Sequence, residues 1–168
     1  WRWLYNPEYG AFNWFLQNLG LKKLFWLSDP RTSLPSLIVM AVWKNFGYNM
    51  LIFLAGLQSI PEELYEAAQL DGASGWQRFR HVTLPMLGPT FVFVGVVTMI
   101  ASFQIFSEPY VMTQGGPLKS TLTLMLLMYE EGFRWWRLGF ATAIAVVLFL
   151  LTLVGTVIQL RLRRETVS

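Results

Sequence analysis

The residues best suited to chemistry lie in a polar stretch, residues 58–85, which separates two long apolar segments. At helical spacing, Ala67 and Ala68 share a face with Asp71, and Glu66 stands beside them. Small side chains let another surface approach the backbone closely, and the carboxylate supplies one charge to pair with that surface. The chemistry that this pattern indicates is docking of a partner protein.

The first part of this stretch is expected to form a short helix. Ser59 and Glu62 have the spacing of a capping box, with Pro61 in the first turn, where its missing N–H group costs nothing. The helix should run to about Leu70 and stop at Gly72, because glycine readily takes the left-handed conformation that ends helices.

A second short helix is expected after the glycine turn. Ser74 and Gln77 have capping-box spacing, and the helix should end near Thr83, because Pro85 disfavours helix at the residue before it. Such a helix–turn–helix can also bind DNA. Four acids against two arginines, and the apolar segments on either side, argue against a nucleic-acid partner.

Composition excludes several classes of catalytic site. The chain of 168 residues has no cysteine and one histidine, His81, which excludes thiol catalysis, thiolate metal sites and multi-histidine metal sites within it. It has no GxxxxGK[ST] loop, so ATP hydrolysis would need another polypeptide. We therefore expect no enzyme activity, cofactor or metal in this chain, and we interpret His81 as an interface residue.

The polar stretch 58–85 must be held in place by the long apolar segments of the chain. Hydrophobic residues make up 54% of the chain and charged residues 14%, and a helix needs roughly 20 apolar residues to cross a bilayer. Windows 34–57, 86–107 and 138–160 meet this length, which predicts an all-α integral membrane protein with about three transmembrane helices. The remaining segments are residues 1–33, which are rich in tryptophan as at membrane interfaces, the connector 58–85, residues 108–137, which include an amphipathic piece too short to span, and the basic tail 161–168.

Polar side chains inside these windows are expected to face a cavity or another helix, because they are costly against lipid. Amide, hydroxyl and aromatic groups suit a sugar, so we hypothesise that six of them include residues lining a substrate pathway. Hydrogen bonding between helices explains each of them equally well. The six are Asn45, Tyr48 and Asn49 in the first window and Ser102, Phe103 and Gln104 in the second.

Two further features of the windows concern helix contacts. Lys44 either snorkels to the interface or pairs with an acid outside this chain. Small residues four apart in the third window, Gly139 with Ala143 and Ala141 with Ala145, predict close helix packing there.

The charge pattern does not assign topology. Three spans would place the connector and the tail on one side, and residues 1–33 and 108–137 on the other. The arginine cluster at 161–164 abuts its span and favours an inside tail, whereas the total of Lys and Arg favours the opposite side. Because the first residue is Trp1 rather than Met, we also expect a longer polypeptide.

The connector resembles the EAA motif of the membrane subunits of binding-protein-dependent ABC importers. That motif is Glu-Ala-Ala, three residues, Gly, nine residues, an aliphatic residue, one residue and Leu-Pro. The matching positions, without a gap, are Glu66, Ala67, Ala68, Gly72, Val82, Leu84 and Pro85, and Asp71 agrees as well. The stretch MLIFLAGLQSIPEELYEAAQLDGAS is similar to the sugar branch of these permeases, and YVMTQGGP resembles a segment of the maltose-type first permease. The resemblance covers nearly the whole chain, as the C-terminal part of one subunit.

The resemblance implies a type I importer permease that lies in the bacterial inner membrane. Residues 61–72 would form a cytoplasmic coupling helix that docks into an ATP-binding subunit, of which there would be two copies carrying ATP and Mg. Glu66 would pair with a basic residue there, Ala67 and Ala68 would allow close packing, and Gly72 would make the turn. A second permease, lipid and an extracytoplasmic solute-binding protein are the other expected partners, the last facing residues 1–33 and 108–137, where Glu130 and Glu131 could contact it.

Three functions compete as explanations of these features. The first is a permease subunit for a sugar or related polyol, and the second is an ion-coupled secondary transporter or channel built on Lys44. The EAA spacing favours the first, because a secondary transporter has no ATPase to dock. A membrane-bound enzyme is a third possibility, and the lack of a paired acid and base in the windows argues against it.

Overall fold

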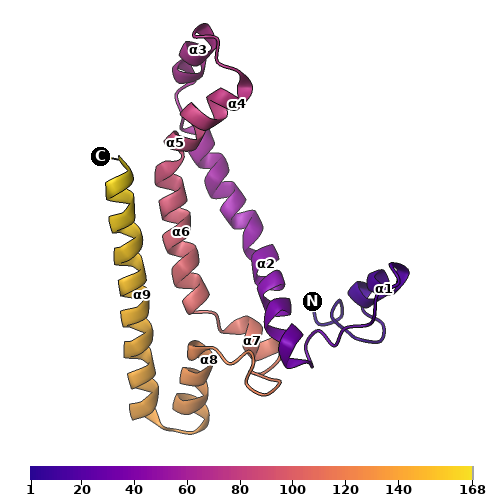
Figure 1. Ribbon diagram of the computed structural model, residues 1–168. Coiled ribbons are helices and arrows are strands. Elements are labelled where there is room, and N and C mark those ends of the chain that lie inside the picture. The colour runs from indigo at the N-terminus through magenta and orange to yellow at the C-terminus, as the bar shows by residue number, and fades with distance from the viewer. Residues whose placement is uncertain (168) are drawn as a thin grey trace. The chain divides into compact units, whose positions relative to one another are not determined.

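The chain folds into helices joined by turns and by two longer irregular segments, residues 19–29 and 113–123 (Figure 1). The computed structural model describes residues 1–167, with only the backbone from residue 162 onward. The expected all-α class is confirmed, and residues 1–167 contain no strand. The elements are α1 (Ala11–Asn18), α2 (Pro30–Gln58), α3 (Glu62–Leu70), α4 (Gly75–Arg78), the π-helical turn η1 (Phe79–Thr83), α5 (Leu84–Met86), α6 (Gly88–Phe103), α7 (Ser107–Met112), α8 (Leu124–Tyr129), the π-helical turn η2 (Glu130–Arg134) and α9 (Leu138–Val167).

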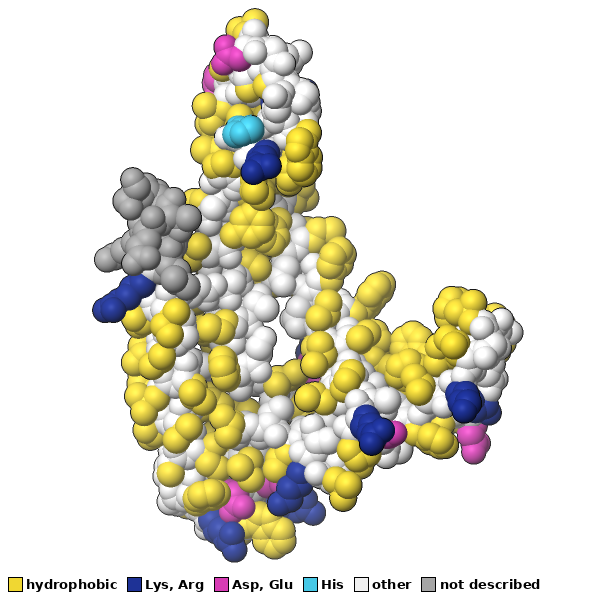
Figure 2. Space-filling model, in the orientation of Figure 1, with side chains coloured by type: hydrophobic (Ala, Val, Ile, Leu, Met, Phe, Trp, Pro, Cys, Tyr) yellow, Lys and Arg dark blue, Asp and Glu magenta, His cyan; other side chains and the backbone are white. Residues whose placement is uncertain are grey.

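Three stretches are long and apolar enough to cross a membrane, as the sequence predicted: Pro30–Gln58, Gly88–Met112 and Leu138–Arg161. Few of their side chains are buried within the protein. Figure 2 shows the middle of α9 as an apolar surface without charged side chains, which is the surface that lipid or another helix covers.

The third helix extends further than its predicted span, 138–160. α9 continues through Val167, so the expected polar tail, 161–168, begins inside the helix. The side chains of residues 162–168, which include two of the three clustered arginines, lie outside the described residues.

The chain divides into two compact units, each with its own packing. The first unit comprises Trp1–Lys44 and Ala101–Leu153. The second comprises Asn45–Ile100 and the part of α9 that begins at Val154.

In the first unit, the tryptophan-rich N-terminal segment forms a small aromatic core rather than only an interfacial surface. Buried Tyr5, Leu37 and Met40 form its centre, and the Tyr5 hydroxyl donates to the Ser36 carbonyl at 2.7 Å. Trp26 packs against Tyr5, with ring centroids 5.8 Å apart. This core attaches the segment to the start of α2.

Asn13 holds the same segment together from α1. Its side chain is 1% exposed and satisfies every group it carries. The Nδ2 group donates to the carbonyls of Pro7 at 3.1 Å and Leu24 at 2.9 Å, and Oδ1 accepts from the Leu24 backbone and the Trp26 indole. A fully satisfied buried amide specifies one loop arrangement.

The predicted span 86–107 overlaps the apolar stretch Gly88–Met112, within which the helix breaks between α6 and α7. In a continuous helix, Pro109 has no N–H to donate to the carbonyl of Ile105, and its ring clashes with that carbonyl. The structure releases the Ile105 carbonyl, which accepts from the Thr123 hydroxyl at 2.9 Å. The same hydroxyl accepts from the Leu126 N–H at 3.2 Å and so caps α8.

Lys44 has its partner in this chain, which corrects the expectation of an acid elsewhere. Its Nζ lies 2.7 Å from Oε1 of Glu108, and the two side chains are 60% and 11% exposed. The carboxylate is therefore the desolvated member of the pair. Both residues belong to stretches able to span a membrane, where charges persist when they pair or face a water-filled cavity.

Replacing Lys44 with methionine is expected to lower the free energy of unfolding by about 1–3 kcal/mol, because Glu108 is left without its counter-charge. This is less than the roughly 3–5 kcal/mol for a fully buried pair, since the lysine end is exposed. Thermal unfolding of the purified full-length transporter measures the effect. The double variant Lys44→Met with Glu108→Gln should recover most of the loss, and purely additive effects would contradict a direct pair.

Close helix packing in the second unit occurs at glycines other than those predicted. A Cβ on Gly56 would meet Thr90, one on Gly95 would meet Gln159, and one on Gly155 would meet Met99. By contrast, a Cβ on the predicted Gly139 would meet nothing within 4 Å. The predicted residues belong to the first unit, where a Cβ on Gly132 would meet the Ala141 side chain, and helix packing at the other predicted positions stays a prediction. Ala141 alone of the predicted set is buried.

Candidate docking site

The end of α3 explains why the sequence needs a glycine at residue 72. The Gly72 N–H donates to the Gln69 carbonyl at 3.0 Å, and the Ala73 N–H donates to the Ala68 carbonyl at 2.9 Å. This pair of bonds is the Schellman motif, which requires a left-handed residue at its centre. Gly72 has φ +76°. The predicted stop at Gly72 is confirmed, with α3 ending at Leu70.

The start of α3 differs from the prediction. The N-cap is Pro61, without a side-chain hydrogen bond, so the capping box of Ser59 and Glu62 does not form. Ser59 still belongs to the end of α2, since its N–H donates to Ala55 at 3.2 Å and its hydroxyl donates to Gly56 at 2.8 Å. The Ser59 side chain is therefore bonded to α2 and does not cap α3.

The second capping box is confirmed. The Ser74 N–H donates to Oε1 of Gln77 at 2.8 Å, and the Gln77 N–H donates to the Ser74 hydroxyl at 3.4 Å. This reciprocal pair starts α4 immediately after the Schellman turn, so both ends of the turn between α3 and α4 are fixed by local bonds.

The predicted helix end near Thr83 is wrong. The backbone stays helical through Leu84, with φ −64° and ψ −45°, and continues into α5. The π-helical turn η1 directly precedes Pro85, and such turns insert an extra residue that changes which carbonyls need a donor. Leu84 and Pro85 are exposed and join η1 to α6. Their predicted part in docking remains a prediction.

A tertiary bond that the sequence did not reveal ties α3 to η1. The Tyr65 hydroxyl lies 2.9 Å from the hydroxyl oxygen of Thr83, and Thr83 is buried. Neither residue is a defined position of the EAA pattern. Their separation of 18 positions gives no helical or turn periodicity from which the contact could be found.

Removing this bond is expected to loosen α3. Tyr65→Phe keeps the ring and loses a hydrogen bond that contributes about 0.5–1.5 kcal/mol. Backbone amides of α3 should then exchange with deuterium about fivefold faster in the purified transporter. Tyr9→Phe is the matched control, because Tyr9 is exposed. Equal exchange in both variants would show that the bond contributes nothing to holding α3.

A shallow cleft of about 290 Å³ opens between α3 and the following helices. Its lining comes from the end of α3, from α4 and from η1, so an inserted side chain would reach these helices at once. Polar groups of both signs border it, since the Asp71 carboxylate faces the same opening as Arg78 and His81. The lining residues are Ala68, Asp71, Gly72, Ala73, Gln77, Arg78, His81 and Val82. His81 Nδ1 lies 3.0 Å from the Gln77 carbonyl, which orients the ring.

The outer face of α3 is available for a partner. Glu66 and Ala67 are exposed and Ala68 is half-buried, and the Glu66 carboxylate has no ion pair among the described residues. Leu70, at the tip, is 89% exposed. Trp76 is also exposed and stacks on Phe79, with centroids 5.5 Å apart.

Leu70 and Trp76 were not singled out from the sequence. A large apolar side chain exposed on a polar loop is a signal for a protein contact, and Trp76 carries that signal in the sequence itself. Glu66, Ala67, Ala68, Asp71 and Gly72 lie together on α3 and its end, as predicted.

The predicted pathway residues fall in two places. Asn45, Tyr48 and Asn49 share one face of α2 in the second unit. Ser102, Phe103 and Gln104 lie at the end of α6 and in the break that follows, in the first unit. Asn49 is half-buried and the other five are exposed. Their role in lining a pathway stays a prediction.

Comparison with known proteins gives one family. Residues 9–167 match the family model described as a binding-protein-dependent transport system inner membrane component. The sulfoquinovosyl glycerol transport system permease protein SmoG of Agrobacterium fabrum is 38% identical over 162 residues, 96% of this chain and 53% of that protein. The trehalose/maltose transport system permease protein MalF of Thermococcus litoralis is 38% identical over 164 residues, 98% of this chain and 55% of that protein.

A solved structure has the same fold. It is a bacterial alginate ABC transporter in complex with an alginate pentasaccharide-bound periplasmic protein. The match has a TM-score of 0.83 and 27% identity, over 98% of this chain and 57% of that chain. The chain spans about half the length of the curated relatives it matches.

Proposed function

Because the chain belongs to the family of binding-protein-dependent transport system inner membrane components, we propose that it is the C-terminal part of a permease subunit in an ATP-driven importer. α3 and the turn after it form the coupling element that receives the movement of a separate ATPase. The observation that carries this proposal is the end of α3, where the Schellman motif presents an exposed Glu66 and exposed Ala67 beside an open cleft. Family membership disfavours the ion-coupled alternative.

The coupling role follows from the physical properties of this surface. Exposed small side chains on α3 let a partner pack against the backbone, and Glu66 offers a charge that no group within the described residues neutralises. Local bonds at Gly72 and Ser74 make the turn stiff. A stiff docked element transmits movement of its partner, whereas a flexible one absorbs it.

The cargo that we propose is a sugar or a related polyol. Relatives carry sugar and polyol names, such as the trehalose/maltose permease MalF and the sn-glycerol-3-phosphate permease UgpA. Three of the residues that would supply hydroxyl partners and ring faces for such a molecule lie on α2, and three lie at the end of α6 and just after it: Asn45, Tyr48, Asn49, Ser102, Phe103 and Gln104. They contribute to the pathway together with parts of the subunit outside this chain.

The proposed assembly places this chain in the cell's inner membrane. Residues 58–85 and the end of α9 face the cytoplasm, and residues 1–33 and 108–137 face outward toward a solute-binding protein. Two ATPase subunits, carrying ATP and Mg, and a second permease complete the transporter. The chain itself has no catalytic role in the proposal, because ATP hydrolysis occurs on the partner.

Site-directed cross-linking tests the coupling surface and the topology together. The chain lacks cysteine, so a cysteine at residue 67 is a unique reporter in a full-length subunit with no other reactive cysteine. Ala67→Cys should cross-link to the co-expressed ATPase. Leu118→Cys is the matched control, because Leu118 is 90% exposed in the segment expected outside. It should react with an impermeant thiol reagent added to whole cells and give no ATPase adduct.

The two cysteine variants also show which results would contradict the proposed function. If neither cysteine cross-links to an ATPase that co-purifies, the coupling surface is elsewhere. If residue 118 cross-links and residue 67 reacts from outside, the topology is inverted. Absence of any associated ATPase would remove the mechanism from the proposal.

A further inference from the structure

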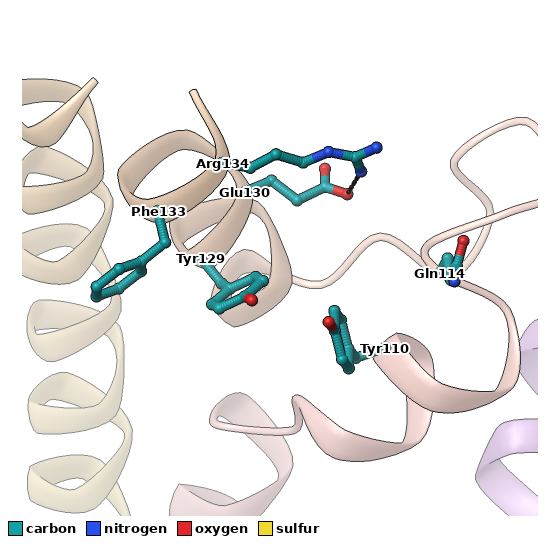
Figure 3. Close-up of a pocket in the computed structure, with 6 residues that line it drawn as sticks. All are labelled: Tyr110, Gln114, Tyr129, Glu130, Phe133 and Arg134. Atoms are coloured by element: carbon teal, nitrogen blue, oxygen red, sulfur yellow. Dashed lines mark ion pairs between the residues drawn. The ribbon is translucent and has the colours of Figure 1, made fainter. Parts of the chain in front are cut away.

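The first unit contains an open pocket that the coupling surface and the predicted pathway do not use. It has a volume of about 360 Å³, within the usual range of small-molecule sites. It lies between α7, the turn after α7 and the α8–η2 segment (Figure 3). The lining residues are Tyr110, Gln114, Tyr129, Glu130, Phe133 and Arg134.

One wall of this pocket is aromatic. Tyr110 and Tyr129 meet edge to face, with ring centroids 5.4 Å apart and planes at 75°, and Phe106 stacks behind Tyr110 at 5.1 Å. Tyr110 is 42% exposed and Phe133 is 68% exposed. The rings are therefore supported from behind while part of their surface stays open, unlike rings that serve only as packing.

The tyrosine hydroxyls are already ordered. The pKa of the Tyr129 hydroxyl is raised above its ordinary value, because its hydrogen bond with Tyr110 and the nearby Tyr110 oxygen disfavour the phenolate.

The opposite wall is polar. The Glu130 carboxylate lies 3.6 Å from the Arg134 guanidinium, which is more exposed than the acid. Figure 3 shows this ion pair beside the two tyrosine rings, with Gln114 across the opening. An acid and a guanidinium already held together offer an acceptor and several donors at fixed positions.

Gln114, across the opening, has a strained backbone. Its φ is +52°, in the left-handed region that non-glycine residues seldom occupy. Such strain collects at binding sites, where the surrounding structure holds one residue in place. Here the neighbouring Thr113 and Thr121 hydroxyls, 2.7 Å apart, and the Thr121 bond to Gly116 at 2.8 Å fix the turn.

We propose that this pocket is a subsite for one pyranose ring of the transported sugar, used before the sugar enters the membrane. A pyranose has flat C–H faces that pack on aromatic rings and equatorial hydroxyls that need paired donors and acceptors. The pocket supplies both: the faces of Tyr110 and Tyr129, and the side chains of Gln114, Glu130 and Arg134. The proposal rests on the proposed function, which gives the outward position of residues 108–137.

Both acids at the start of η2 have a basic partner within the segment. Glu130 lies 3.6 Å from Arg134 and Glu131 lies 3.4 Å from Arg137, and their expected contact with a binding protein stays a prediction. Their charges are therefore largely neutralised within the segment. A pocket with no free net charge suits a neutral, hydroxyl-rich ligand.

Saturation-transfer NMR on the purified full-length transporter, without its binding protein, tests the subsite. The probes are maltose, methyl α-glucoside and glycerol. Maltose and the glucoside should show transfer to their ring protons, and glycerol should show much less, because it lacks a ring face. Tyr129→Ala should weaken maltose binding about tenfold, and Tyr129→Phe about fivefold, the effect of one hydrogen bond.

Controls separate the subsite from its alternatives. Tyr9→Ala removes an exposed tyrosine that does not line the pocket and should leave the signal unchanged. Should Tyr129→Ala fail to fold, Gln114→Ala and Arg134→Gln alter exposed polar groups and should still weaken binding severalfold. No signal with any sugar in the wild type, or equal signals in wild type and every pocket variant, would overturn the proposal.

Two further outcomes are distinguishable. If the sugar signal is absent and Tyr129→Ala instead weakens capture of the solute-binding protein, the pocket holds a segment of that protein, and the sugar subsite is wrong. The Ala67→Cys cross-link, measured in the same preparation, reports the proposed function separately. A positive cross-link without a sugar signal overturns the subsite alone.

Discussion

Gly72→Val is expected to reduce ATP-driven uptake by at least about tenfold while leaving the subunit in the membrane. Residue 72 has φ +76°, where a residue with a Cβ loses about 1–2 kcal/mol and a β-branched one more. A Cβ built there meets nothing within 4 Å, so the effect is one of backbone conformation alone. The valine should move the chain out of the left-handed region and break the bonds to the carbonyls of Ala68 and Gln69.

Two neighbouring substitutions control this result. Asparagine is similar in size to valine but tolerates the left-handed conformation. Uptake by the Gly72→Asn variant should therefore stay within about threefold of wild type. Gly75→Ala also adds a Cβ in open space, but inside α4, where the backbone is ordinary. Uptake and ATPase co-purification are measured in parallel. Equal effects of valine and asparagine would refute an explanation based on backbone conformation.

Glu66→Arg is expected to have the second largest effect, a loss of ATPase co-purification and a fall of at least about tenfold in uptake. Glu66 is exposed and unpaired within the described residues, so reversing its charge should not destabilise the fold. In a docked complex, the substitution places like charges together where attraction was present. Glu66→Gln should lose only the attraction, so uptake should fall severalfold.

The matched control for Glu66→Arg is Glu63→Arg. It makes the same change on the same helix, one turn earlier, where the carboxylate mainly complements the helix dipole by about 0.3–1 kcal/mol. Uptake and pull-down with the ATPase at two salt concentrations measure both variants. If the two reversals act alike, the effect comes from net charge on the loop rather than from a specific partner of Glu66.

The sequence predicted features that depend on neighbours close in the chain. The stop at Gly72 and the box at Ser74 and Gln77 are local, because the bonds join residues at most five positions apart. The spans are also local, since length and apolar composition define them. The EAA pattern is also local, and it located the exposed residues of α3 that we propose as the docking surface.

Features that depend on distant neighbours could not be predicted. The partner of Lys44 is Glu108, 64 positions away, and the Tyr65–Thr83 bond crosses a turn. The helix break after α6 had a visible cause in Pro109, but composition alone made the span look continuous. Helix packing at Gly56 and Gly155 depends on which faces meet, which no single helix reveals.

The Thr123 hydroxyl connects two segments of the first unit, because it forms a hydrogen bond with each of them. It donates to the Ile105 carbonyl, which Pro109 has left without a helical donor, and it accepts from the Leu126 N–H in the first turn of α8. Any rotation that carries the end of α6 must therefore either pull the start of α8 along or release both bonds together. The rim of the aromatic pocket would shift with α8, so opening of the helix break and the shape of that pocket change as one event.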